Sequence, residues 1–166
     1  MNTIKQMLTE MEREAQTTRK FLSIIPEDKF DWQPHPKSMN IERLSRHLAE
    51  LPMWVAMTLT TDELDFENNP YDPKPVKSRK ELLDMFDASL ASGKAHLENA
   101  NEKQLEEMWT LRSGKTIYST EPKYEVLRMT FCQIVHHRAQ LGVFLRLLNV
   151  PIPGSYGPSA DEMNFN

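Results

Sequence analysis

The stretch KYEVLRMTFCQIVHHRAQLGVFLRLL, residues 123–148, is the longest uninterrupted helical pattern in the chain. Its apolar residues recur at intervals of three and four, which is the spacing of an amphipathic helix with a broad buried face. Pro122 suits the first turn of this helix, and Ser119 or Thr120 is available as its cap. The sequence therefore predicts one long and strongly apolar helix near the end of the chain.

Three further stretches show the same periodicity and predict the other helices of a bundle. They cover residues 4–25, about 40–59 and 79–97. The second of these helices begins near Ser38 to Asn40 and contains Pro52, which removes a backbone hydrogen bond and predicts a kink. The third helix follows Ser78, a favourable capping residue. Four long helices predict helix-on-helix packing around one core.

The connections between the helices differ in length and character. Residues 62–78, DELDFENNPYDPKPVKS, are acidic and rich in proline, which predicts a long surface crossover. Residues 109–119, WTLRSGKTIYS, place β-favouring residues on both sides of Ser113-Gly114 and predict a small hairpin or loop before the last helix. The predicted fold class is all-α, a four-helix bundle of the up-down-down-up type with a long crossover, in a single domain over residues 1–166.

Charge and cysteine usage exclude several classes of function. The net charge is −4, and no lysine or arginine run forms the basic stripe that nucleic-acid binding requires. Cys132 is the only cysteine, so no intramolecular disulfide is expected. The chain shows neither a signal peptide nor a membrane span. We expect a soluble cytoplasmic protein with no nucleic-acid or membrane partner.

Two histidines point towards the predicted core from different helices. At about 100° per residue, Gln133 falls within about 40° of His137, and Leu51 and Trp54 fall within about 40° of His47. An inward imidazole requires a hydrogen-bond partner, because burying an unpaired polar group is costly. The pattern leaves two alternatives open: core histidines satisfied locally, or a metal ion that both imidazoles share.

Three segments carry a resemblance to a known family. They are WQPHPKSM at residues 32–39, RLSRHLAELPMW at 43–54, and HHRAQLGVFLRLLNVPIPGSYGPSADE at 136–162. Together they resemble the DinB/YfiT-like superfamily over nearly the whole chain. The resemblance implies a four-helix bundle and, in members that bind metal, three histidines: one on the second helix and two on the last helix at positions i and i+4.

Carried over residue by residue, this pattern falls on His47, Gln133 and His137. Gln133 departs from it, and an amide oxygen is a weaker and harder ligand than imidazole for zinc or nickel. Three outcomes remain open: a weakened site with Gln133 or water as the third ligand, a site that has lost its metal, and a replacement ligand from a loop.

The resemblance implies a metal-dependent enzyme of the hydrolase or thiol S-transferase type, acting on a small-molecule substrate. A zinc or nickel ion and a low-molecular-weight thiol are the expected cofactors. The alternative is a metal-free bundle that binds a small molecule or serves in a stress response without catalysis. Met129, Val143 and Leu147 lie off the His137 face of an apolar helix, which predicts a homodimer. Arg138 is expected to pair with Asp161 or Glu162 if the tail folds back.

Overall fold

A computed structural model describes residues 2–163 and contains four long helices. They are α1 (Thr3–Ser23), α2 (Ile41–Thr60), α3 (Arg79–Asn99) and α4 (Lys123–Leu147), with short 3₁₀ turns η1 (Glu27–Lys29) and η2 (Gln104–Glu106) between them. The side chains of Asn2, Asn40 and Ser78 cap the first three helices by accepting backbone hydrogen bonds. Within the described residues, no helix is both long and apolar enough to cross a membrane.

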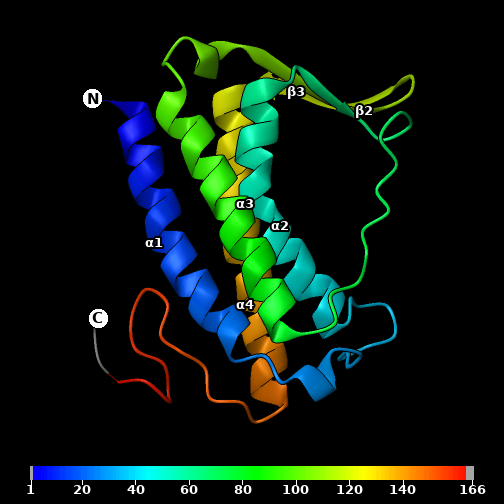
Figure 1. Cartoon of the computed structure of the whole chain (residues 1–166), viewed down its shortest axis with the longest axis vertical. Helices are drawn as coiled ribbons and strands as arrows, with labels where there is room; N and C mark the ends of the chain where they lie inside the picture. Colours follow the sequence, from blue (N-terminus) through cyan, green and yellow to red (C-terminus); the bar gives the residue numbers. More distant parts are fainter. Residues whose placement is uncertain (1, 164–166) are drawn as a thin grey trace.

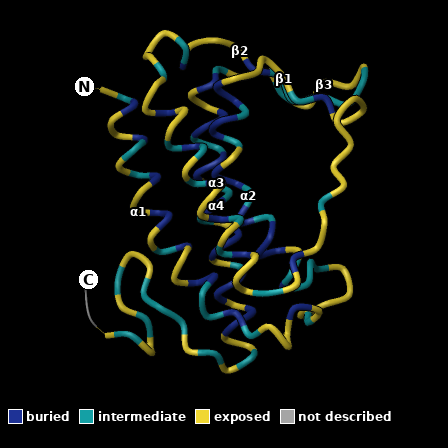
Figure 2. Tube along the Cα trace, in the orientation of Figure 1, coloured by how far each residue is buried: buried dark blue, intermediate teal, exposed yellow. Residues whose placement is uncertain are grey.

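The four helices pack side by side around one core. In Figure 1, α1 and α4 run in one direction along the long axis, whereas α2 and α3 run in the other. Helix α2 packs against α3 and α4, and α1 packs against the same two helices. The buried residues gather on the faces that the helices turn towards one another (Figure 2). This arrangement brings α2 and α4 together along much of their length.

The all-α fold class is wrong, because a three-stranded mixed sheet lies across one end of the bundle (Figure 1). Its strands are β1 (Glu63–Asp65), β2 (Met108–Ser113) and β3 (Thr116–Pro122). Strand β1 pairs in parallel with β2, and β2 pairs antiparallel with β3. The predicted hairpin therefore supplies two of the three strands, β2 and β3, and β1 was not predicted. The three residues of β1 are too few for an alternating pattern, and only their pairing with β2 makes them a strand.

Local chemistry fixes the hairpin one residue later than the sequence predicts. Ser113 pairs with Thr116, and Gly114 has a φ of +54°, which glycine adopts without strain. The carboxylate of Asp65 accepts a hydrogen bond from the Gly114 backbone nitrogen at 2.8 Å, so β1 holds the turn in place. The predicted caps of α4 are also wrong: Ser119 and Thr120 belong to β3, and Pro122 precedes the helix without a side-chain cap.

A side chain from α3 compensates for Pro52 inside α2. The hydroxyl of Ser89 accepts a hydrogen bond from the Met53 backbone nitrogen at 2.8 Å and donates one to the Glu50 carbonyl at 3.1 Å. Both backbone groups lie in the turn that a proline disturbs. Gly93 lies against the Pro52 carbonyl, where an added Cβ would come within 2.3 Å of the oxygen. The contact between α2 and α3 is thus built around this proline.

Candidate metal centre

The contact between α2 and α4 brings together the two histidines singled out from the sequence. The ring centroids of His47 and His137 lie 4.7 Å apart, with the ring planes at 77°. His137 is only 9% exposed, and His47 is partly buried. The sequence positions predicted to converge do converge, with one imidazole from each helix.

Gln133 completes this cluster one helical turn before His137. Its Oε1 atom lies 3.1 Å from the Nε2 atom of His137, and the Oε1 atom of Gln140 lies 3.0 Å from Nδ1 of the same ring. The Gln133 amide nitrogen donates to the sulfur of Met129 at 3.2 Å, which orients its oxygen towards the histidine. Both nitrogens of one imidazole therefore face an amide oxygen.

Two glutamines can together satisfy a neutral His137. A neutral histidine carries a single N–H, which can donate to the oxygen of Gln133 or of Gln140 but not to both. At the other ring nitrogen, a half-turn of the glutamine amide presents its N–H group as the donor. The two amides therefore hold the ring in place, with or without an ion.

Protonation of either imidazole to the charged form is disfavoured. Burial lowers the pKa of His47, and the neighbouring His137 lowers it further, although Glu50 and Gln133 act in the opposite direction. Burial also lowers the pKa of His137, where the hydrogen bond to Gln140 opposes the effect and His136 adds to it. Both imidazoles are thus held in the neutral form, which is the form that binds metal.

The donor set fits a divalent ion only in part. Among residues 2–163, no group of three or more histidine, cysteine, aspartate or glutamate side chains is arranged to hold a metal ion. The cluster instead offers two imidazole nitrogens and the Gln133 oxygen. Imidazole suits zinc and nickel, and an amide oxygen is an acceptable though weaker third donor.

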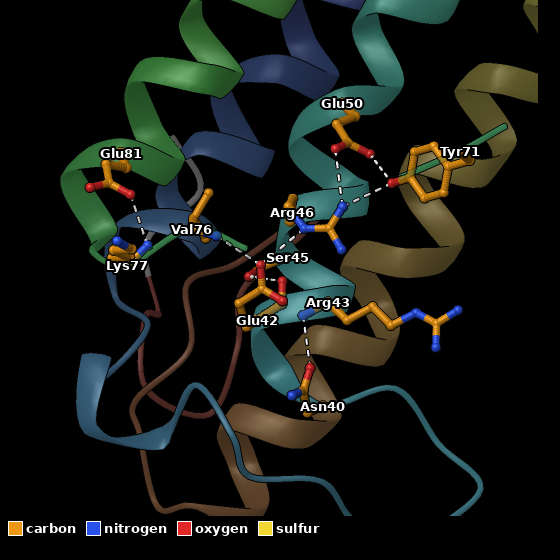
Figure 3. Close-up of polar contacts among 10 residues, drawn as sticks. All are labelled: Asn40, Glu42, Arg43, Ser45, Arg46, Glu50, Tyr71, Val76, Lys77 and Glu81. Carbon is orange, nitrogen blue, oxygen red and sulfur yellow. Dashed lines mark hydrogen bonds and ion pairs between the residues drawn. The ribbon is translucent and has the colours of Figure 1, made fainter. Parts of the chain in front are cut away.

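A polar network surrounds Arg46, the residue before His47 on α2 (Figure 3). Arg46 is buried and donates to the carboxylates of Glu42 and Glu50 at 2.9 Å and 3.2 Å. The hydroxyl of Tyr71, from the crossover, accepts a hydrogen bond from Arg46 at 2.9 Å and donates one to Glu50. Glu42 also accepts the backbone N–H of Val76 at 3.0 Å. The crossover is thereby fixed against the helix that carries His47.

The remaining histidines and the cysteine lie outside the cluster. His136 is exposed, although its ring centroid is 5.0 Å from that of His137. His35 accepts a backbone hydrogen bond in its loop, and His96 contacts the Ser92 carbonyl in the last turns of α3. Cys132 is exposed. Among the described residues, none of these four side chains forms a hydrogen bond or ring contact with His47.

The pairing expected for Arg138 is wrong. The tail does fold back, but Asp161 pairs with Arg146, and Glu162 accepts the Gly154 backbone N–H at 2.8 Å. Arg138 instead donates to Glu14 of α1 at 2.6 Å. It points into the bundle, where α1 supplies the carboxylate, so the tail's acidic residues are out of its reach.

Two residues near the cluster were missed from the sequence. Gln140 lies three residues after His137, a spacing that places it on the same side of a helix, so helical geometry alone could have indicated it. Tyr71 reaches Arg46 and Glu50 from a segment without periodicity. No sequence signal predicts that contact.

Together the fold and this cluster define a class of protein: a four-helix bundle in which the first and last helices run opposite to the middle two, with a small sheet at one end and paired histidines on its second and fourth helices. The sequence model of the DinB family matches residues 1–164, and the chain belongs to that family.

Individual relatives are distant in sequence but similar in fold. The protein YrdA of Bacillus subtilis is 22% identical over 164 residues, which are 96% of this chain and 92% of YrdA. The crystal structure of a DinB-like protein from Bacillus cereus ATCC 10987 is 20% identical, covers 93% of this chain and 99% of its own, and has a TM-score of 0.72. That of the mycothiol-dependent maleylpyruvate isomerase is 15% identical, covers 84% of this chain and 60% of its own, and has a TM-score of 0.59.

Proposed function

We propose that the chain binds a divalent metal ion, zinc or nickel, through His47 and His137, with the amide oxygen of Gln133 as a third ligand. The observation that carries this proposal is the convergence of two imidazoles and one amide oxygen: the rings of His47 and His137 lie 4.7 Å apart, and the Gln133 oxygen lies 3.1 Å from Nε2 of His137. Imidazole nitrogen and amide oxygen are both groups that can bind a divalent ion. The neutral state that burial imposes on both histidines supports the same assignment.

Neighbouring residues orient the ligands. The Gln140 oxygen accepts the Nδ1 proton of His137, which leaves the lone pair of Nε2 directed towards Gln133. Such outer hydrogen bonds fix the tautomer and raise the basicity of a metal-bound histidine. On the other helix, the network of Arg46, Glu50 and Tyr71 holds the turn before and after His47.

The proposed activity is that of a hydrolase or thiol S-transferase acting on a small molecule. When bound with open positions, a zinc or nickel ion lowers the pKa of a bound water or thiol and polarises a substrate. A low-molecular-weight thiol is proposed as co-substrate. Its support is the similarity in fold to a mycothiol-dependent isomerase, which is an analogy at the level of the fold.

Elemental analysis of protein purified without a histidine tag tests the metal site. Near-stoichiometric metal in the wild type, lost in His47→Ala and His137→Ala but retained in His96→Ala, is the expected result. His96 is an exposed histidine outside the cluster and serves as the matched control. Metal retained in both cluster variants would overturn the proposal.

A panel of thiol-transfer and hydrolysis reactions tests catalysis separately. Metal-loaded wild type should turn over at least one substrate class, and His47→Ala should not. Identical behaviour of the two proteins across the panel would favour a metal-free binding bundle.

We also propose a homodimer in the cytoplasm. Its support is the exposure of Val143 and Leu147 on α4, at 59% and 58%. A monomeric mass by light scattering at micromolar concentration would overturn the dimer.

A further inference from the structure

The tail beyond α4 forms a wall that is fixed beside the bundle. Figure 1 shows it folding back alongside α1. Asp161 pairs with Arg146 of α4 and accepts the backbone N–H of Ile152 at 3.0 Å. Between these anchors, the Tyr156 hydroxyl donates a hydrogen bond to Glu14 of α1 at 2.9 Å. The tail is therefore held against both α4 and α1.

An apolar hollow of about 510 Å³ lies between this wall and α4. Most of the residues that line it are apolar, among them Phe21, Gly142, Val143, Leu147, Ile152 and Pro153. An added Cβ at Gly142 would come within 3.1 Å of the Phe21 ring, so α1 and α4 meet closely on the inner side of the hollow. The lining residues of α4 run from Ala139 to Leu147, which is about 12 Å of helix. An elongated apolar hollow of this kind fits one hydrocarbon chain.

A polar cavity of about 1160 Å³ adjoins the hollow and shares Ser155 and Tyr156 with it. Arg13 of α1 lines this polar cavity. It directly precedes Glu14, the residue that Tyr156 contacts, and so lies level with the junction of the two cavities. Lys5, which lines the same cavity, lies about 12 Å farther along α1. The cation of α1 at the junction is therefore Arg13.

Arg13 also carries an uncompensated charge. Glu10 and Glu14 are the acidic residues that line the polar cavity. Arg128 binds the first of them, and Arg138 binds the second. Within residues 2–163, the exposed Arg13 side chain forms neither an ion pair nor a hydrogen bond. An exposed guanidinium alone does not mark a site, but this one lies at the polar end of an apolar hollow, and a guanidinium binds carboxylate and phosphate groups. The charge therefore matches a ligand whose hydrocarbon chain ends in an anionic head group.

We propose that the joined cavities bind a single-chain amphiphile with an anionic head group, such as a fatty acid. The chain lies in the hollow between α4 and the tail, and the head group lies against Arg13. In the described part of the chain, neither cavity is lined by His47, Gln133 or His137, so this site is separate from the proposed metal centre. Binding of the amphiphile does not require the metal.

Calorimetric titration of octanoate, decanoate and laurate into the metal-free full-length chain, below the concentrations at which micelles form, tests this inference. Each two-carbon extension should tighten binding about tenfold, because every buried methylene group adds hydrophobic stabilisation. Arg13→Gln should weaken the binding of all three at least fivefold and leave the dependence on chain length unchanged. Val143→Asn should flatten that dependence, because it places a polar amide in the wall of the hollow.

Arg43→Gln provides the matched control. Arg43 is an exposed arginine on α2 that lines neither cavity, so its replacement should leave every dissociation constant within twofold of wild type. Dodecyl phosphate should also bind in a manner that depends on Arg13, whereas dodecyltrimethylammonium should not bind. No binding of laurate, equal affinity in wild type and Arg13→Gln, or an affinity independent of chain length would overturn the inference.

A second copy of the chain is the competing occupant of the hollow, since the proposed homodimer would cover Val143 and Leu147. Light scattering of the titrated samples decides between the two occupants. Protein saturated with laurate should have a monomeric mass. A wild-type dimer that does not bind laurate would assign the hollow to the subunit interface and overturn the inference.

Discussion

Arg138 of α4 and Glu14 of α1 form an ion pair in the interior of the bundle, with both residues at least 90% buried. The nitrogen and oxygen are 2.6 Å apart, and Arg138 also donates to Thr18 and to Tyr156. The Tyr156 hydroxyl in turn donates to Glu14 at 2.9 Å. A residue of the tail thus closes a network that joins the first and last helices.

Removing the carboxylate of Glu14 should be strongly destabilising. Glu14→Ala leaves the buried guanidinium of Arg138 without its counter-charge, which typically costs about 3–5 kcal/mol in the free energy of unfolding. Glu10→Ala is the control, because Glu10 pairs with Arg128 near the surface and such pairs contribute at most about 1 kcal/mol. Urea denaturation measures both. If the two variants lost similar amounts of unfolding free energy, the buried pair would contribute no more to stability than the surface pair does.

Ser89 should stabilise the proline-containing turn of α2. Ser89→Ala leaves the Met53 N–H and the Glu50 carbonyl without their hydroxyl partner, and an unsatisfied buried polar group costs about 1–3 kcal/mol. Ser92→Ala, on the same helix, should cost less than about 0.5 kcal/mol, because within residues 2–163 the partly buried Ser92 hydroxyl makes no hydrogen bond. Thermal unfolding of the two variants provides the comparison, and an unchanged Ser89→Ala protein would contradict the role given to this hydroxyl.

The paired histidines should make the metal-free protein less stable as the pH falls. Their pKa values are lowered in the folded state, mainly by burial, from the ordinary value of 6.5. Below that value the unfolded chain binds protons that the folded chain does not, so the free energy of unfolding decreases as the pH drops from about 7 to about 5. A double variant, His47→Gln with His137→Gln, should show a shallower dependence in urea denaturation over this range. The same slope in both proteins would contradict the prediction.

Gln133→His should tighten zinc binding. Imidazole is a better zinc ligand than an amide oxygen, and position 133 lies one turn before His137 on the face that meets His47. We expect the dissociation constant to fall at least tenfold in competition with a chromophoric chelator. Unchanged or weaker binding would indicate that the side chain at position 133 does not reach the ion.

The sequence predicts the helices and the histidine pair well because both depend on helical periodicity. A period near 3.6 places His47 and Gln133 on inward faces whatever the details of packing. Strand β1 and the Arg138–Glu14 pair depend on contacts between segments far apart in the chain, for which Glu63–Asp65 and Arg138 carry no local signal. Arg138 also shows that an acidic tail near a basic residue is a poor guide to pairing when a buried carboxylate is available.

Calorimetric titration of zinc into metal-free protein tests the central claim most directly. The account predicts one site per chain in wild type and in His96→Ala, with binding abolished in His47→Ala and in His137→Ala. Zinc binding that is equally strong in the two cluster variants, or no binding in wild type, would contradict a metal centre between α2 and α4.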